Sequence, residues 1–137
     1  MASGGATILF VEDEVRQLTL MQKFLGSQGF RVLGAKDGAE AVEMHLRHKE
    51  EISLVVLDLG LPKLNGWEAY QMMKDVDPNV RAIFATGFMS PELEAQMKQE
   101  QMNAVIMKPY ELREALAKIS AVLQQAPGSE VAQPRPA

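Results

Sequence analysis

Five polar side chains stand directly after short apolar runs of the sequence, and their types suit one kind of chemistry. They are Glu12, Asp13, Asp58, Thr86 and Lys108. If the apolar runs are parallel strands, their carboxyl ends meet at one edge of a sheet and bring these side chains together. Crowded carboxylates repel one another unless a cation lies among them, and hard oxygen ligands favour Mg²⁺. The sequence therefore predicts a Mg²⁺ site.

Asp58 is the expected reacting group of this cluster. A carboxylate beside a bound cation stays ionised, and it can attack phosphorus to form an acyl phosphate. Lys108 would then hold the phosphoryl oxygens as a point charge, and Thr86 would donate its hydroxyl to them. The predicted reaction is the transfer of a phosphoryl group onto Asp58.

The elements that must position these residues alternate along the chain. Five runs are rich in Val, Ile, Leu and Phe with little polar alternation, as expected of strands covered on both faces. They are Thr7–Val11, Arg31–Ala35, Leu54–Leu57, Arg81–Ala85 and Ala104–Met107. Helical periodicity separates them. Its markers are the stripe Leu18, Met21 and Leu25, the stripe Ala39, Val42 and Leu46, the segments Trp67–Val76 and Pro91 to about Gln101, and the stripe Leu112, Leu116, Ile119 and Leu123.

Capping and turn residues agree with this division. The signals are an N-cap and first helical residue at Ser90 and Pro91, a helix end at Gly29 and a turn at Asn65-Gly66. Strands that alternate with helices imply right-handed βαβ crossovers, which place helices on both faces of a mostly parallel sheet. The predicted fold is a doubly wound α/β domain, a three-layer sandwich around a five-stranded parallel sheet.

Length and composition fit one globular domain. The chain has 137 residues, and no apolar run approaches the about 20 residues needed to cross a bilayer, so no membrane span is expected. Its net charge is -4 with dispersed Lys and Arg, so direct binding of nucleic acid is not expected. The lack of cysteine fits a cytoplasmic location. Residues 1–5 are interpreted as a flexible linker or tag, residues 6–124 as the domain and the proline-rich residues 125–137 as a disordered tail.

The candidate site residues lie within four motifs. In chain order these are Ile8-Leu9-Phe10-Val11-Glu12-Asp13-Glu14, Leu57-Asp58-Leu59-Gly60-Leu61-Pro62 with Gly66, Thr86-Gly87, and Lys108-Pro109-Tyr110. The set resembles the signature positions of response-regulator receiver domains of two-component signalling, over about residues 6–124. The resemblance implies a flavodoxin-like sheet of strand order 2-1-3-4-5. It also implies a regulatory phosphoacceptor in a phosphorelay rather than an enzyme for external substrates, with a histidine kinase or histidine phosphotransfer protein as partner.

The resemblance also assigns roles to individual residues. It implies Mg²⁺ as cofactor, bound by Asp13 and Asp58 directly, by Glu12 through water and by the main-chain carbonyl of Gly60. It further implies a cis peptide bond at Lys108-Pro109. These assignments extend the site that the residue types alone indicate.

Val105 departs from the family pattern. It stands before Lys108 at a position where the family often has an aromatic residue that reports the state of Thr86 to the outer surface. We therefore expect the switch to act through Thr86 and the backbone, with Val105 at most filling vacated space. Gly60 and Phe88 occupy positions that tune the lifetime of the phosphoaspartate in the family, and that lifetime does not follow from their types.

Two alternatives stay open on sequence alone. The domain could be a degenerate receiver that acts as a phosphorylation-independent interaction module, although the retained site residues argue against this. The chain could also be a stand-alone regulator or the receiver of a larger hybrid sensor kinase.

A hydrolase that forms a phosphoaspartate is disfavoured, because Gly60 stands where a second acid would be needed. Walker and dinucleotide-binding glycine motifs do not occur.

The remaining polar and sulfur-containing residues are assigned no chemistry. His45 and His48 are expected on a solvated helix face, because they stand among Arg47, Lys49 and Glu50. Trp67 and the nine methionines are expected to be packing residues.

Overall fold

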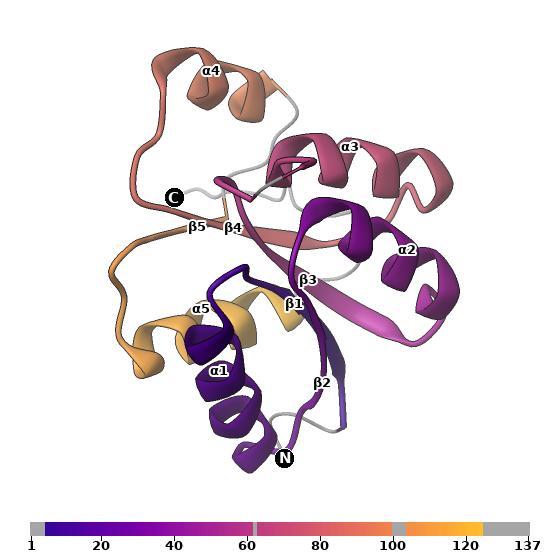
Figure 1. Ribbon diagram of the computed structural model, residues 1–137, viewed down its shortest axis with the longest axis vertical. Helices are drawn as coiled ribbons and strands as arrows, with labels where there is room; N and C mark the ends of the chain where they lie inside the picture. The colour runs from indigo at the N-terminus through magenta and orange to yellow at the C-terminus, as the bar shows by residue number, and fades with distance from the viewer. Residues whose placement is uncertain (1–4, 62, 100–103, 125–137) are drawn as a thin grey trace.

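The computed structural model describes residues 5–61, 63–99 and 104–124 (Figure 1). The tail predicted for residues 125–137 lies outside these residues, as does the predicted linker apart from Gly5. The predicted end of the fourth helix near Gln101 and Pro62 of the second motif also lie outside them.

Five parallel strands form one sheet in the order β2-β1-β3-β4-β5. They are β1 Thr7–Val11, β2 Arg31–Ala35, β3 Ile52–Asp58, β4 Ala82–Thr86 and β5 Val105–Met107. Every residue of β1 and of β4 is buried, which explains why these runs contain so few polar side chains. The structure thus confirms the predicted doubly wound sheet and its flavodoxin-like order.

Helices cover both faces of this sheet. They are α1 Val15–Ser27, α2 Gly38–His48, α3 Gly66–Val76, α4 Pro91–Gln99 and α5 Leu112–Leu123. One core cluster unites α1 and α5 with one face, and a second unites α2, α3 and Met97 of α4 with the other (Figure 1). The three layers are those that the alternating pattern predicts. Among the described helices, none is both long and apolar enough to span a membrane.

Two strands end one residue later than the sequence predicts, at the positions that matter for chemistry. Asp58 is the last residue of β3, and Thr86 is the last residue of β4. Asp58 pairs with Ala85 in the parallel register. The sheet itself therefore fixes the backbone of Asp58 and Thr86, while Glu12 and Lys108 follow their strands as predicted.

The turn predicted at Asn65-Gly66 is wrong, because Gly66 is the first residue of α3. The Asn65 side chain accepts a hydrogen bond from the Glu68 amide at 2.9 Å, and the Glu68 side chain accepts one from the Asn65 amide at 3.2 Å. Asparagine is favoured at turns and also at helix N-caps, and the glutamate three residues later selects the second use. The N-cap predicted at Ser90 is confirmed, since its hydroxyl accepts from the Leu93 amide at 3.1 Å.

Trp67 packs as predicted at the start of α3. Its ring centroid lies 5.5 Å from that of Tyr70 and 5.5 Å from that of Phe84 on β4. Aromatic pairs at this spacing add to the stability gained by burial. The cluster therefore anchors the first turn of α3, which directly follows the loop after Asp58.

The fourth helix has the weakest anchorage of the five. Met97 is its only buried residue among those described, and Leu93 is partly buried against the same cluster. A helix with so little buried apolar surface costs little free energy to displace.

The apolar stripe predicted for α2 is rotated in the structure. Its buried residues are Gly38, Ala41 and His45, whereas Ala39 and Leu46 are exposed. The prediction followed the apolar residues Ala39, Val42 and Leu46, but a glycine and a histidine occupy two of the inward positions.

His45 is buried, so the expectation that it would be solvated is wrong. Its side chain is 1% exposed, and Nε2 lies 3.3 Å from Oδ2 of Asp77 at the end of α3. Its Nδ1 atom has no hydrogen-bond partner among the described residues. Burial lowers the pKa of His45, and the hydrogen bond to Asp77 opposes this shift. The ring is therefore neutral at pH 7 and packs as a core residue.

We expect the free energy of unfolding to fall as the pH drops below about 6.5. The unfolded chain protonates its histidines near pH 6.5, whereas folded His45 takes up a proton only at lower pH, so the unfolded state binds more protons. Stability from the neutral ring is complete above the unfolded pKa and is lost on acidification through the folded pKa. The slope approaches about 1.4 kcal/mol per pH unit, and urea unfolding between about pH 7.5 and about pH 5.5 measures it.

His48 provides the matched control for this measurement, because its side chain is partly exposed at 24%. We expect His45→Leu to flatten the dependence over this pH range and His48→Gln to keep it. An unchanged slope in His45→Leu would assign the dependence to other groups.

Candidate functional site

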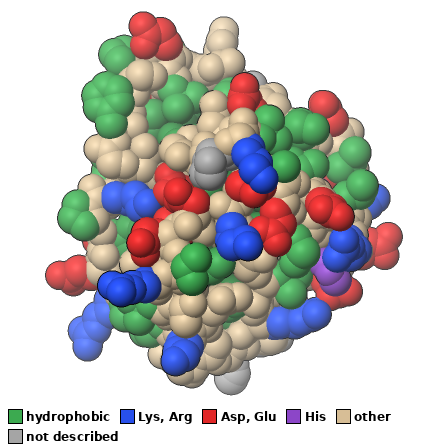
Figure 2. All heavy atoms as spheres, viewed as in Figure 1, with side chains coloured by type: hydrophobic (Ala, Val, Ile, Leu, Met, Phe, Trp, Pro, Cys, Tyr) green, Lys and Arg blue, Asp and Glu red, His purple; other side chains and the backbone are tan. Residues whose placement is uncertain are grey.

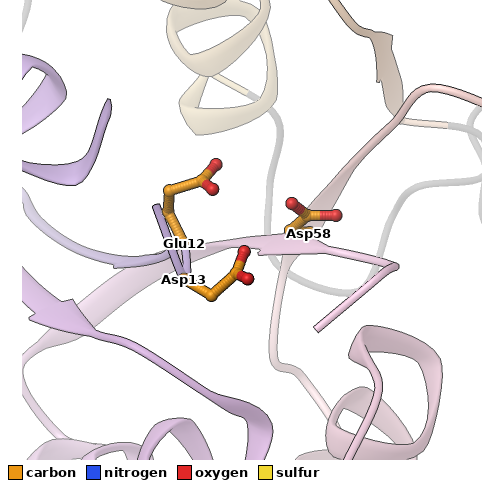
Figure 3. A group of neighbouring side chains, drawn as sticks. All are labelled: Glu12, Asp13 and Asp58. Atoms are coloured by element: carbon orange, nitrogen blue, oxygen red, sulfur yellow. The ribbon is translucent and has the colours of Figure 1, made fainter. Parts of the chain in front are cut away.

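The carboxyl edge of the sheet brings the predicted acids together. Glu12 and Asp13 follow β1, and Asp58 ends the neighbouring strand β3. Each of the three offers one carboxylate oxygen, and these oxygens all lie within 4.8 Å of one another. Figure 3 shows the carboxylates of Asp13 and Asp58 facing a common space with Glu12 beside them. The structure thus assembles the cluster that strand-end reasoning predicts.

Lys108 reaches into this cluster from the end of β5. Its Nζ atom donates to Oδ2 of Asp58 at 2.7 Å and to Oε1 of Glu12 at 3.3 Å. Its backbone amide donates to the carbonyl of Thr86 at 2.8 Å, which fixes the chain where it leaves the sheet. The Lys108-Pro109 peptide bond is cis, as the family resemblance implies.

Burial and opposing charges set the electrostatics of the site. Glu12 is 2% exposed, and this burial raises the pKa of its carboxyl, although the amide of Glu14 and the charge of Lys108 oppose the rise. Burial alone would lower the pKa of Lys108, but its hydrogen bonds to Asp58 and Glu12 and their charges raise it. Lys108 therefore stays protonated, and its positive charge offsets the negative charges of Asp58 and Glu12.

The loop after β3 closely surrounds Asp58. The Gly60 amide donates to Oδ1 of Asp58 at 2.8 Å, so Gly60 and Lys108 hold different oxygens of one carboxylate. Gly66 returns to the same place, since a Cβ atom added there would lie 2.5 Å from the Asp58 carbonyl oxygen. Only glycine allows this close approach. Coordination of Mg²⁺ by the Gly60 carbonyl stays a prediction.

Thr86 directs its hydroxyl to its own loop. Oγ1 donates to the Phe88 carbonyl at 2.7 Å and accepts from the Phe88 amide at 3.2 Å. The sequence places Thr86 at the site but gives no sign of this local partner. In the protein without a phosphoryl group, the hydroxyl must exchange these bonds before it can donate toward Asp58.

Tyr110 is a neighbour of the site to which the sequence assigned no role. Its hydroxyl accepts a hydrogen bond from Nε2 of Gln17 on α1 at 3.4 Å. Burial raises the pKa of Tyr110, and the charges of Glu12 and Asp58 contribute to the rise. The bond links α1 to the segment after Lys108, and no motif in the sequence pairs Gln17 with Tyr110.

The donor set fits Mg²⁺. The cluster supplies only oxygen ligands, and two of its acids, Glu12 and Asp58, are buried where an uncompensated negative charge is costly. Asp13 is exposed and gives the ion a route from solvent. A hard divalent cation bound by Glu12, Asp13 and Asp58 would offset their mutual repulsion.

The fold and the site define a class of proteins, namely doubly wound α/β domains with an acidic cluster and a lysine at the carboxyl edge of the sheet. The sequence model described as the response regulator receiver domain matches residues 8–120. The chain belongs to this family, the receiver domains of two-component systems.

The chain is similar to short proteins that it covers almost completely and to a sensor kinase of which it covers only a small part. The response regulator receiver protein CpdR of Brucella abortus (strain 2308) is 28% identical over 116 residues, which cover 85% of this chain and 95% of CpdR. Sporulation initiation phosphotransferase F of Bacillus subtilis (strain 168) is 29% identical over 116 residues, covering 81% and 90%. Sensor kinase CckA of Brucella abortus (strain 2308) is 26% identical over 123 residues, covering 90% of this chain. The chain spans only 13% of that kinase.

Solved structures show the same fold. A chain in the CheX-CheY-BeF3-Mg+2 complex from Borrelia burgdorferi superposes with a TM-score of 0.80 at 26% identity, covering 88% of this chain and 90% of that chain. A CheY-like response regulator receiver domain protein from Methanospirillum hungatei JF-1 gives 0.79 at 28% identity, covering 88% and 94%. These neighbours support the flavodoxin-like assignment.

Proposed function

We propose that this receiver domain accepts a phosphoryl group from a phosphohistidine donor onto Asp58, with Mg²⁺ as cofactor, and changes conformation in response. The observation that carries the proposal is the Asp58 carboxylate, which lies between Lys108 and the Gly60 amide and beside two further acids. The donor is a histidine kinase or a histidine phosphotransfer protein. The domain is regulatory, and it promotes its own phosphorylation and dephosphorylation.

The residues of the site divide the work of the transfer. A carboxylate oxygen of Asp58 attacks phosphorus, and the bond between phosphorus and the donor imidazole nitrogen breaks as the imidazole leaves. Lys108 balances the charge of the phosphoryl oxygens, and Thr86 donates its hydroxyl to one of them. When bound by Glu12, Asp13 and Asp58, Mg²⁺ supplies charge neutralisation for the same oxygens. Positioning and electrostatics account for the reaction, as is usual for phosphoryl transfer.

A phosphorylation-independent interaction module is the alternative, and no observation favours it. A degenerate site would be expected to lack the acceptor, the lysine or the acids. Here Asp58, Lys108, Glu12 and Asp13 are all present and in contact or close to contact.

The proposed partner is a protein rather than a nucleic acid. Figure 2 shows Lys and Arg side chains interspersed with Asp and Glu side chains on the face in view, without a large patch of one sign. A nucleic-acid-binding face would concentrate positive charge. We also propose a cytoplasmic location, which the lack of cysteine in the sequence supports.

We expect millimolar Mg²⁺ to raise the melting temperature. The cation binds the folded site and relieves repulsion among its acids, and a concentration about tenfold above Kd stabilises by about 1.4 kcal/mol. For a domain of this size, the expected rise is a few degrees. Thermal melts in EDTA and in Mg²⁺ measure it.

Asp13→Ala should remove most of this rise, because Asp13 offers one of the clustered ligand oxygens. Asp75→Ala is the matched control, since Asp75 is an exposed acid on α3 outside the site. Equal stabilisation of Asp13→Ala and wild type would show that the cation acts elsewhere.

The decisive test of the proposal adds Mg²⁺ and then beryllofluoride, a mimic of the phosphoryl group, while backbone amide shifts are recorded. Mg²⁺ should first shift the amides near Glu12, Asp13 and Asp58. Beryllofluoride should then shift those near Thr86 and Lys108. Lack of any response to beryllofluoride in the presence of Mg²⁺ would contradict the phosphoacceptor role.

A further inference from the structure

The loop between Asp58 and α3, which the structure describes at residues 59–61 and 63–65, contacts the start of α2 through Lys63 and Leu64. The Leu64 backbone lies very close to Gly38 of α2. A Cβ atom added at Gly38 would lie 1.7 Å from the carbonyl oxygen of Leu64 and 2.6 Å from its carbonyl carbon. Both atoms belong to the backbone, so no side-chain rotation can relieve the clash. Any larger residue at position 38 must move the loop or the helix.

The start of α2 is firmly held on its own side of this contact. Asp37 is the N-cap, and its Oδ1 accepts from the Glu40 amide at 2.8 Å. Oε1 of Glu40 in turn accepts from the Lys36 amide at 2.8 Å. The first bond satisfies one free amide of the first turn, and the second ties Glu40 to the residue before the cap, so both fix the backbone at the start of α2. A shift of the loop relieves the clash without breaking these bonds.

The Asp37 carboxylate also contacts the loop directly. Oδ2 of Asp37 lies 3.5 Å from Nζ of Lys63, while its Oδ1 caps the helix. Lys63 has a φ of 67°, in the left-handed region that non-glycine residues rarely adopt. A backbone in this conformation persists where surrounding contacts enforce it, and the contacts with α2 are of that kind.

The other side of the loop touches the phosphoacceptor. The Gly60 amide donates to Oδ1 of Asp58 at 2.8 Å, and the Gly66 backbone packs against the Asp58 carbonyl. The described residues of the loop thus contact Asp58 through Gly60 and the start of α2 through Leu64. Gly66 lies two residues after Leu64, so a displacement at Leu64 is passed along the described backbone to the contact with Asp58.

We propose that Asp37 and Gly38 are positioning residues for the phosphoacceptor site, which they hold in place through Lys63 and Leu64 of the loop before α3. This inference rests on the proposed function of Asp58 and deepens it. It extends the site to the first turn of α2, which contributes no atom to the acid cluster. A contact that shifts this turn changes Mg²⁺ affinity and phosphoryl uptake together.

The test compares Gly38→Ala with Gly26→Ala by Mg²⁺ titration. Trp67 is the only tryptophan, and it directly follows Gly66, so its fluorescence reports on the loop. We expect Gly38→Ala to weaken Mg²⁺ binding about tenfold, as substitutions behind metal ligands commonly do. Phosphoryl uptake from acetyl phosphate should slow by a similar factor. Gly26→Ala makes the same change on α1, where an added Cβ meets nothing within 4 Å, and should leave Mg²⁺ affinity unchanged.

A general loss of stability must be separated from a loss of positioning. Ile119→Val removes a methyl group from the core under α5, far along the chain from the loop, and should lower the melting temperature while keeping the Mg²⁺ Kd. Wild-type Mg²⁺ affinity in folded Gly38→Ala overturns the proposal. If Gly38→Ala does not fold, Asp37→Ser decides, because serine keeps a cap but loses the charge facing Lys63. A Kd weakened about two- to threefold supports the proposal, and an unchanged Kd overturns it.

The same experiment can refute the proposed function of Asp58 without refuting the positioning role of Asp37 and Gly38. Wild-type protein that binds Mg²⁺ but takes up no phosphoryl group would refute phosphorylation of Asp58. The Mg²⁺ affinities of the α2 variants would still show whether this turn positions the site.

Discussion

Asp58→Asn is expected to abolish the uptake of a phosphoryl group from acetyl phosphate. The amide that replaces the carboxylate has no anionic oxygen to attack phosphorus, and it loses the charged contact with Lys108 at 2.7 Å. Asparagine has nearly the same shape, so the bond from the Gly60 amide and the packing of Gly66 should persist. Intact-mass measurement after incubation with acetyl phosphate and Mg²⁺ gives a direct result, with one added phosphoryl group in wild type and none in the variant.

Two controls make this result specific. Asp75→Asn makes the same substitution at an exposed position on α3 and should keep wild-type uptake. EDTA should suppress uptake in wild type, because the three clustered acids need a cation for the reaction. Uptake by Asp58→Asn at the wild-type level would mean that another side chain is the acceptor.

Much of the fold follows from the sequence because its signals are local and repeated. Buried strands such as β1 and β4 are continuous apolar runs, and no surface face interrupts them. The acids and Lys108 were predictable as a group, since each stands at the end of such a run and parallel topology makes those ends neighbours.

The errors occur where one residue type serves two structural purposes. His45 looked solvated among charged neighbours, but its Asp77 partner comes from α3, a contact that only tertiary packing reveals. Asn65 signals a turn or a helix cap equally well until Glu68 is considered. Helical periodicity misplaced the α2 stripe because Gly38, an inward residue, carries no apolar side chain.

The contacts that control the site are also invisible in the sequence. Thr86 was predicted to face a phosphoryl group, but in the structure its hydroxyl is bonded to the backbone of Phe88. The approach of Gly38 to Leu64 depends on the path of a loop, which no periodicity encodes. Residue type and strand order thus predict which groups meet, while loop geometry decides how they are held.

Thr86→Ala is expected to remove most of the amide shift response to beryllofluoride outside the acid cluster. In the free protein the Thr86 hydroxyl bonds to the Phe88 carbonyl and amide. A phosphoryl group on Asp58 offers a charged acceptor, and hydrogen bonds to charged acceptors are stronger than those to neutral ones. The hydroxyl should therefore turn inward and release the segment 87–90, and with it α4, whose only described buried residue is Met97.

Val105 should contribute little to this response. It pairs with Phe84 in the sheet and is partly buried against the core that α4 covers. A β-branched side chain has few rotamers to exchange and no hydroxyl to present at the surface, so it can at most fill space that Thr86 vacates. We therefore expect the signal to be carried mainly by displacement of the backbone after β4, and a partner to sense it at the surface of α4, β5 and α5.

Three variants separate these contributions in one titration series with Mg²⁺ and beryllofluoride. Thr86→Ser keeps the hydroxyl and should retain shifts across residues 86–99 and 104–108, whereas Thr86→Ala should lose most of them. Val105→Ala should keep most of the response, because the hydroxyl and the loop are unchanged. Loss of the response in Val105→Ala with its survival in Thr86→Ala would refute a route through the threonine. Equal loss in Thr86→Ser and Thr86→Ala would instead assign the switch to the methyl group and its packing, since serine lacks only that group.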